Sequence, residues 1–170
     1  MMSRRENHNL AGAVRPSLFG SVRWPKARQP SRAIALAMIE NTVKWADLET
    51  LCRPHYQADQ RKRGRKGYSL AMMMRCRVVQ EVWELSDEAT ENAILDSYAL
   101  ALFVGTDPWE PRPPSASALR AFRTCLDDAE VLDRFGVIVE QSFLLQGLEF
   151  RPGYIREPIF RRQTLGGVSG

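Results

Sequence analysis

The chain has 170 residues, 44% of them hydrophobic, which fits one folded domain with tails. It holds no run of about 18 apolar residues and no compact apolar stretch at its N-terminus, which argues against a membrane span and a secretory signal. The net charge of +4 is divided: residues 1–80 carry 16 Lys/Arg and 5 Asp/Glu, residues 81–150 carry 4 Lys/Arg and 14 Asp/Glu, and residues 151–170 carry 4 Lys/Arg and 1 Asp/Glu. The first half is therefore the part expected to attract a polyanion.

The cysteines and histidines give no metal or redox motif. Cys52, Cys76 and Cys125 form no CxxC pair, and their odd number fits reduced thiols in a cytoplasmic protein. The two histidines, His8 and His55, have no ligand spacing to a cysteine. No metal and no cofactor are expected.

The N-terminal third predicts an arm followed by two short helices. Residues 1–30 hold three prolines and scattered arginines without periodicity, which favours a flexible basic arm reaching to about residue 35. Its aromatic residues could dock on the domain. A short helix is expected from Ser31, its N-cap, and a second from Trp45, which Pro54 would end.

A basic loop and the main helix follow. The segment RKRGRKGY, residues 61–68, is predicted to be a loop, because two glycines interrupt it and five like charges repel one another. Ser69 would cap the next helix, LAMMMRCRVVQEVWEL, which is apolar over more than one stripe and therefore central to a bundle. Its methionines are core filler rather than a metal site.

Serines and glycines divide the second half into further short helices. Ser86 is expected to cap a helix that breaks near Ser97 and ends by Gly105. After a proline-rich loop, Ser115 or Ser117 would cap another helix, and Asp128 would cap the last, which Gly147 ends. No segment alternates at period two, so no dependable strand is expected.

The fold class is therefore all-α, a compact bundle of six or seven short helices. The expected organisation is a flexible basic arm at 1–35, a helical domain at 36–150 and a divergent, disordered tail at 151–170.

The basic segment is the strongest candidate for chemistry. Phosphates would attract its five charged side chains, and arginines add bidentate geometry. These residues are Arg61, Lys62, Arg63, Arg65 and Lys66. A solvated charged loop or a localisation tag would satisfy the same composition.

Other arginines could add DNA contacts. Arg120 and Arg123 lie three apart in the helix at 116–126, so they share a face, and small residues at its start would let the helix N-terminus approach a phosphate. Two ordinary surface arginines remain an alternative. Arg75 could reach DNA or pair with an acidic residue such as Glu81, Glu84 or Glu88. For Arg77 a pair with Glu81, four residues on, is favoured. The carboxylates between 84 and 96 have a structural spacing.

The order of these features resembles the N-terminal domain of InsH-type insertion-sequence transposases, which belong to the DDE transposases. The resemblance covers about residues 40–152. The matching pieces, in order, are Pro54-His55-Tyr56, Gly64-Arg65-Lys66-Gly67-Tyr68-Ser69, Met72-Met73-Met74-Arg75, Trp83-Glu84-Leu85-Ser86-Asp87, Glu91-Asn92-Ala93, Asp96-Ser97, Phe103-Val104-Gly105 and Phe122-Arg123.

The resemblance implies binding to the terminal inverted repeats of a transposon in DNA transposition. Catalysis in such enzymes belongs to a following RNase H-like domain with three metal-binding carboxylates. Glu157 stands near the place of the first of these, but Arg156 and Pro158 flank it, and the chain offers no later ones. We therefore expect a truncated, non-enzymatic fragment.

The expected partner is double-stranded DNA at transposon ends, in the cytoplasm of a bacterium and associated with its nucleoid. The alternative is a protein-interaction module that forms mixed oligomers with a full-length transposase, or homo-oligomers, and regulates transposition. No membrane partner is expected.

Overall fold

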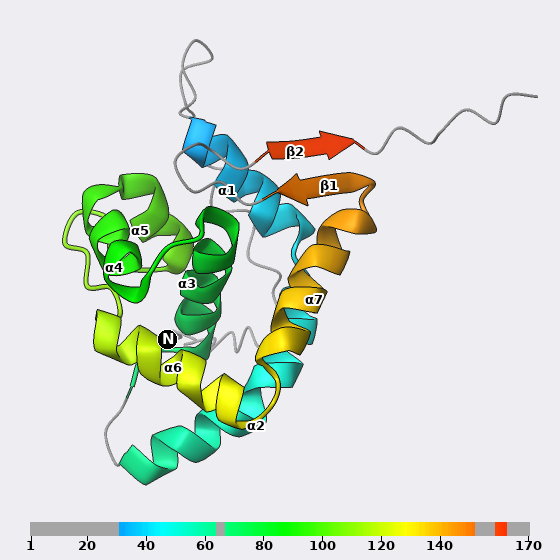
Figure 1. Ribbon diagram of the computed structural model, residues 1–170. Helices are drawn as coiled ribbons and strands as arrows, with labels where there is room; N and C mark the ends of the chain where they lie inside the picture. The colour runs from blue at the N-terminus through cyan, green and yellow to red at the C-terminus, as the bar shows by residue number, and fades with distance from the viewer. Residues whose placement is uncertain (1–30, 64–66, 152–158, 163–170) are drawn as a thin grey trace, which may run out of the picture.

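The computed structural model describes residues 31–63, 67–151 and 159–162. The all-α expectation is confirmed, because these residues form seven helices and one small hairpin (Figure 1). The elements in chain order are α1 (Ser31–Thr42), α2 (Trp45–Arg63), α3 (Leu70–Trp83), α4 (Asp87–Asp96), α5 (Tyr98–Val104), α6 (Ala116–Asp128), α7 (Leu132–Leu144), β1 (Leu148–Arg151) and β2 (Ile159–Arg162).

Helix α3 lies at the centre of the bundle. It contacts α2, α4, α5 and α6, and eight of its 14 residues are buried. Figure 1 shows α4 and α5 on one side of it and α7 on the other. Several helices surround α3, which explains why apolar residues occupy more than one of its faces.

Serine hydroxyls start four of the helices; the sequence predicts three of these caps, and at Ser97 it predicts only a break in the helix. The Oγ atoms of Ser69, Ser86, Ser97 and Ser115 each accept a hydrogen bond from the backbone N–H three residues on. Each bond satisfies one of the N–H groups that lack a partner at a helix start. For α6 the cap is Ser115 and not Ser117.

The predicted cap at Asp128 is wrong, because Asp128 is the last residue of α6. The chain then turns through Glu130, which has a φ of 56°, and the Val131 N–H donates to the Leu126 carbonyl at 3.0 Å. This is a Schellman ending, usually built on glycine. Helix α7 begins without a side-chain cap.

Helix α3 ends in the same way, with a left-handed Glu84 at φ 50°. The Leu85 N–H donates to the Gln80 carbonyl at 3.1 Å. Helix α5 uses a glycine for this purpose, Gly105, at φ 88°.

The prediction that Pro54 ends the second helix is wrong. Helix α2 continues through this exposed proline to Arg63. Buried side chains anchor the helix on both sides of it, Cys52 before and Tyr56 after. The Tyr56 ring packs edge-on against Phe122 at 5.4 Å, and its hydroxyl donates to the Tyr68 carbonyl at 2.7 Å. Tertiary contacts thus offset the lost backbone hydrogen bond.

The continuation of α2 corrects the predicted loop at residues 61–68. Arg61, Lys62 and Arg63 are helical, whereas Gly64, Arg65 and Lys66 lie outside the described residues.

The expectation of no strand is wrong at the C-terminal side. Strands β1 and β2 pair antiparallel, with Leu148 opposite Arg162 and Arg151 opposite Ile159. The hairpin lies beside α7 (Figure 1), and the ring centroids of Phe160 and Phe143 are 5.2 Å apart. Four residues a strand are too few to show a clear alternation in the sequence.

The predicted arm is described only from residue 31, where α1 already begins. Residues 1–30, 152–158 and 163–170, with Glu157 among them, lie outside the described part of the chain.

Candidate nucleic-acid interface

The carboxyl end of α2 carries the first three residues of the basic segment. Arg61, Lys62 and Arg63 are consecutive helical positions, so they are distributed around the helix axis rather than along one face. In Figure 1 this end of α2 extends past α6 at the bottom of the view, away from α3. Positive charge also suits the carboxyl end of a helix, where the helix dipole is negative.

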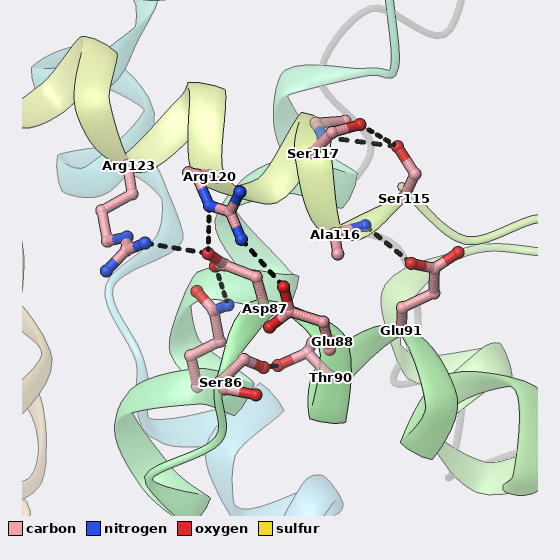
Figure 2. Close-up of polar contacts among 12 residues, drawn as sticks. Ser86, Asp87, Glu88, Thr90, Glu91, Ser115, Ala116, Ser117, Arg120 and Arg123 are labelled. Atoms are coloured by element: carbon pink, nitrogen blue, oxygen red, sulfur yellow. Dashed lines mark hydrogen bonds and ion pairs between the residues drawn. The ribbon is translucent and has the colours of Figure 1, made fainter.

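The two arginines of α6 lie on one face, as their spacing predicts, and both face carboxylates of α4 (Figure 2). Arg123 Nη2 donates to Asp87 Oδ2 at 2.8 Å, and Arg120 Nη2 donates to Glu88 Oε1 at 2.8 Å. Arg120 Nε is also 3.7 Å from Asp87 Oδ2. The side chains of Arg120 and Arg123 are 58% and 45% exposed, so both guanidinium groups remain accessible while they are paired.

Asp87 is the centre of this cluster, and its side chain is only 6% exposed. Its second oxygen, Oδ1, accepts a hydrogen bond from Gln80 Nε2 of α3 at 2.9 Å. One carboxylate therefore ties α3, α4 and α6 together. The sequence predicts an acidic first turn for α4 but not these partners, because Gln80 and Asp87 carry no signal of contact with residues 120–123.

The N-terminus of α6 is occupied by a carboxylate of the same chain. The Ala116 N–H donates to Glu91 Oε2 at 2.7 Å, next to the Ser115 cap (Figure 2). A phosphate at this helix end would have to compete with the Glu91 carboxylate, which already supplies the negative charge that a helix N-terminus favours.

Arg75 lies in a different place from the other predicted arginines. Its two terminal nitrogens both donate to the Glu40 carboxylate, and its guanidinium lies 4.5 Å from the Trp45 ring centroid and 5.1 Å from that of Phe103. The side chain is 15% exposed. Arg75 thus pairs with an acidic residue, but this residue is Glu40 of α1 and none of the three carboxylates named from the sequence.

Arg77 forms the predicted ion pair with Glu81.

The residues that the sequence predicts for the site are not brought together in one place. The structure puts three at the end of α2, two on α6 against α4, and Arg75 between α1, α2 and α5, while Arg65 and Lys66 lie outside the described residues.

Within the described ranges, no group of three or more His, Cys, Asp or Glu side chains has the arrangement of a metal site. No helix among the same residues is long and apolar enough to cross a membrane.

A comparison with protein families matches residues 25–125 to the Transposase domain (DUF772). The match spans more than half of the chain, and the chain therefore belongs to this family. The matched region contains α1 to α5 and most of α6, so it includes both the carboxyl end of α2 and the Asp87 cluster. No solved structure is significantly similar to the chain.

Proposed function

We propose that this transposase-family chain binds double-stranded DNA at transposon ends, and that the basic segment beginning at Arg61 makes the main contact. The observation that carries the proposal is the placement of three consecutive basic residues at an end of α2 that extends past the bundle. Such a projection can approach a phosphate backbone at a distance from the four carboxylates of α4, which would repel it. Phosphate contacts of this kind position a protein on a duplex and make its affinity depend on salt.

The binding test compares two triple variants that lose the same charge. The first variant removes the three positive charges at the carboxyl end of α2 (Arg61→Gln/Lys62→Gln/Arg63→Gln). The second removes three exposed positive charges elsewhere (Arg112→Gln/Arg134→Gln/Arg151→Gln). Fluorescence anisotropy with a labelled inverted-repeat duplex should show a loss of about tenfold or more for the first variant and under about twofold for the second. The slope of log K against log salt should fall by about 2.7 in the first variant only.

An equal loss in both triple variants would reduce the effect to net charge and remove the proposed contact. Absence of binding by the unaltered chain at low salt would remove the function itself.

Sequence preference is assigned to Arg120 and Arg123 as a second element of the proposal. Their partly exposed guanidinium groups share one face of α6, and arginine reads guanine with two hydrogen bonds. Arg120→Lys/Arg123→Lys keeps the charges but loses the fork geometry. Its affinity for a scrambled duplex should be unchanged while its preference for the inverted repeat falls; an unchanged preference would leave these arginines as structural residues only.

We propose further that residues 1–170 do not themselves cut DNA, because Arg156 and Pro158 flank Glu157, the carboxylate that stands near the place of the first metal ligand in the related nuclease domains. Incubation of the purified chain and a transposon-end duplex with Mg²⁺ or Mn²⁺ should leave the strands intact. Nicking that disappears in Glu157→Gln would contradict this.

The alternative function is a protein-interaction module, which is favoured by the apolar side chains of Leu144 and Leu145, exposed at the end of α7. Mixed oligomers with a full-length transposase would appear in size-exclusion chromatography with light scattering. A strict monomer in the presence of the transposase would argue against this alternative.

A further inference from the structure

An aromatic pair projects from the side of the bundle that α5 forms. Trp109 is 85% exposed and Tyr98 is 42% exposed, and their ring centroids lie 5.5 Å apart at an interplanar angle of 71°. We call these two residues the aromatic pair. Tryptophan is a large apolar group, and leaving it in water forgoes the stabilisation that burial would give. An exposed tryptophan paired with a second ring is thus available for contact with another segment or molecule.

The loop that carries Trp109 is held in one shape. The Trp109 N–H donates to Asp107 Oδ1 at 2.9 Å, and the Arg112 N–H donates to Thr106 Oγ1 at 2.8 Å. Prolines at 108 and 111 fix two further φ angles. The tryptophan is therefore presented before any contact forms, which lowers the entropy cost of binding.

The charges beside the aromatic pair select the kind of partner. Asp96 precedes Tyr98 by two residues, and Asp107 and Glu110 flank Trp109; all three carboxylates are exposed. Arg112 is the basic residue of this loop, and it is paired with Glu110 at 2.6 Å. The surface thus favours a cationic occupant and disfavours nucleic acid. An arginine or lysine could also lie over the indole face, a favourable cation–π contact.

We propose that this surface binds residues 1–30 of the same chain. That segment carries six Lys/Arg and one Glu, and it includes Phe19 and Trp24, so its charge and apolar side chains complement the aromatic pair. It joins the bundle at Ser31, the start of α1, and α1 packs against α5, the helix that Tyr98 begins. Thirty residues can span up to about 100 Å, so reach sets no limit. A tethered segment also has an effective concentration of about millimolar, which favours it over a second copy.

The test is photo-crosslinking in the full-length chain with p-benzoylphenylalanine in place of Trp109. An equal mixture of ¹⁴N- and ¹⁵N-labelled chains distinguishes contacts within one molecule from contacts between two. Mass spectrometry should find the main crosslink inside residues 1–30 and of a single isotope label. Arg23→Gln/Lys26→Gln/Arg28→Gln should lower its yield about threefold or more, because these substitutions remove half of the basic residues of the segment.

The matched control places the same photo-reactive residue at Val137, an exposed position on α7. It should give no crosslink to residues 1–30, and circular dichroism should show both labelled chains to be folded. A mixed-isotope crosslink, a crosslink to residues 31–162, or no crosslink from position 109 would each overturn the proposal. None of these outcomes bears on DNA binding by α2, which the anisotropy measurement decides separately.

Discussion

Arg123 of α6 donates to the buried carboxylate of Asp87 at 2.8 Å, and this contact joins α6 to the first turn of α4. The other carboxylate oxygen accepts from Gln80 of α3. A buried carboxylate is stable only if its oxygens have partners, and here the partners come from two further helices. The cluster is thus a joint between three helices, whatever its arginines contact on their exposed side.

Removal of the Asp87 carboxylate should destabilise the fold. In Asp87→Ala the Gln80 amide, buried beside it, loses its acceptor, and the half-exposed Arg123 loses its ion-pair partner. We expect the free energy of unfolding to fall by about 2–4 kcal/mol, as measured by urea denaturation. Asp87→Asn keeps the size of the side chain and should cost less.

The control for Asp87→Ala is Glu110→Ala, which breaks the exposed pair with Arg112. Exposed ion pairs contribute about 0–1 kcal/mol, so this variant should unfold almost like the unaltered chain. Equal midpoints for Asp87→Ala and Glu110→Ala would show that the three-helix joint is unimportant for stability.

Arg75 should matter for stability rather than for DNA affinity. Its planar guanidinium forms two hydrogen bonds to Glu40 and lies over the rings of Trp45 and Phe103. Lysine keeps the charge but loses the fork and the stacking, so Arg75→Lys should lower the free energy of unfolding by about 1–2 kcal/mol.

In the anisotropy assay at a temperature where it is folded, Arg75→Lys should bind the duplex like the unaltered chain. A large loss of affinity without a loss of stability would instead assign Arg75 to the DNA contact.

The local signals of the sequence predict most of the helix starts, because a serine cap acts over three residues. Ser69, Ser86, Ser97 and Ser115 need no tertiary contact to satisfy an N–H. The helix ends are harder to predict. Glu84 and Glu130 take left-handed conformations that a sequence pattern assigns to glycine, and only the packing of the following residues holds them there.

The sequence predicts which basic residues are candidates for the site, but not which acidic residues they contact in the fold. Spacing alone places Arg120 and Arg123 on one face. It cannot show that this face meets Asp87 and Glu88, since residues 32 to 36 apart are brought together by packing. In the same way Arg75 follows the basic segment in the sequence, yet its partner Glu40 lies 35 residues earlier.

Replacement of Pro54 should stabilise α2. The proline is exposed inside a 19-residue helix and cannot donate the N–H bond that its position requires. Pro54→Ala restores the N–H donor and introduces a better helix former. We expect the free energy of unfolding to rise by about 1 kcal/mol, which corresponds to an increase of a few degrees in the midpoint of thermal unfolding.

Thr50→Val is a matched control for Pro54→Ala, because the Thr50 hydroxyl donates only to the Ala46 carbonyl one turn earlier. Its midpoint should change little. A lower midpoint for Pro54→Ala would show that the helix depends on a bend that the proline supplies.

The buried cysteines should make the fold sensitive to alkaline pH. Burial raises the pKa of the Cys52 thiol from 9.0 to about 12, with a smaller contribution from Cys125, and burial raises the pKa of the Cys76 thiol to about 12 as well. Below pH 9 both the folded and the unfolded chain keep these protons, so the two thiols do not lower the free energy of unfolding. Between pH 9 and 12 the unfolded chain releases them while the folded chain holds them, and stability falls as pH rises.

From pH 8 to pH 10 the loss should be about 1 kcal/mol for each thiol in urea denaturation. Cys52→Ala/Cys76→Ala removes both titrating groups, so its free energy of unfolding should fall less over that interval, by about 2–3 kcal/mol, even if the smaller side chains lower stability at every pH. Cys125→Ala, at a partly exposed position, should keep most of the fall. The same pH dependence in the double variant and in the unaltered chain would mean that the two thiols ionise as easily in the folded bundle as in the unfolded chain.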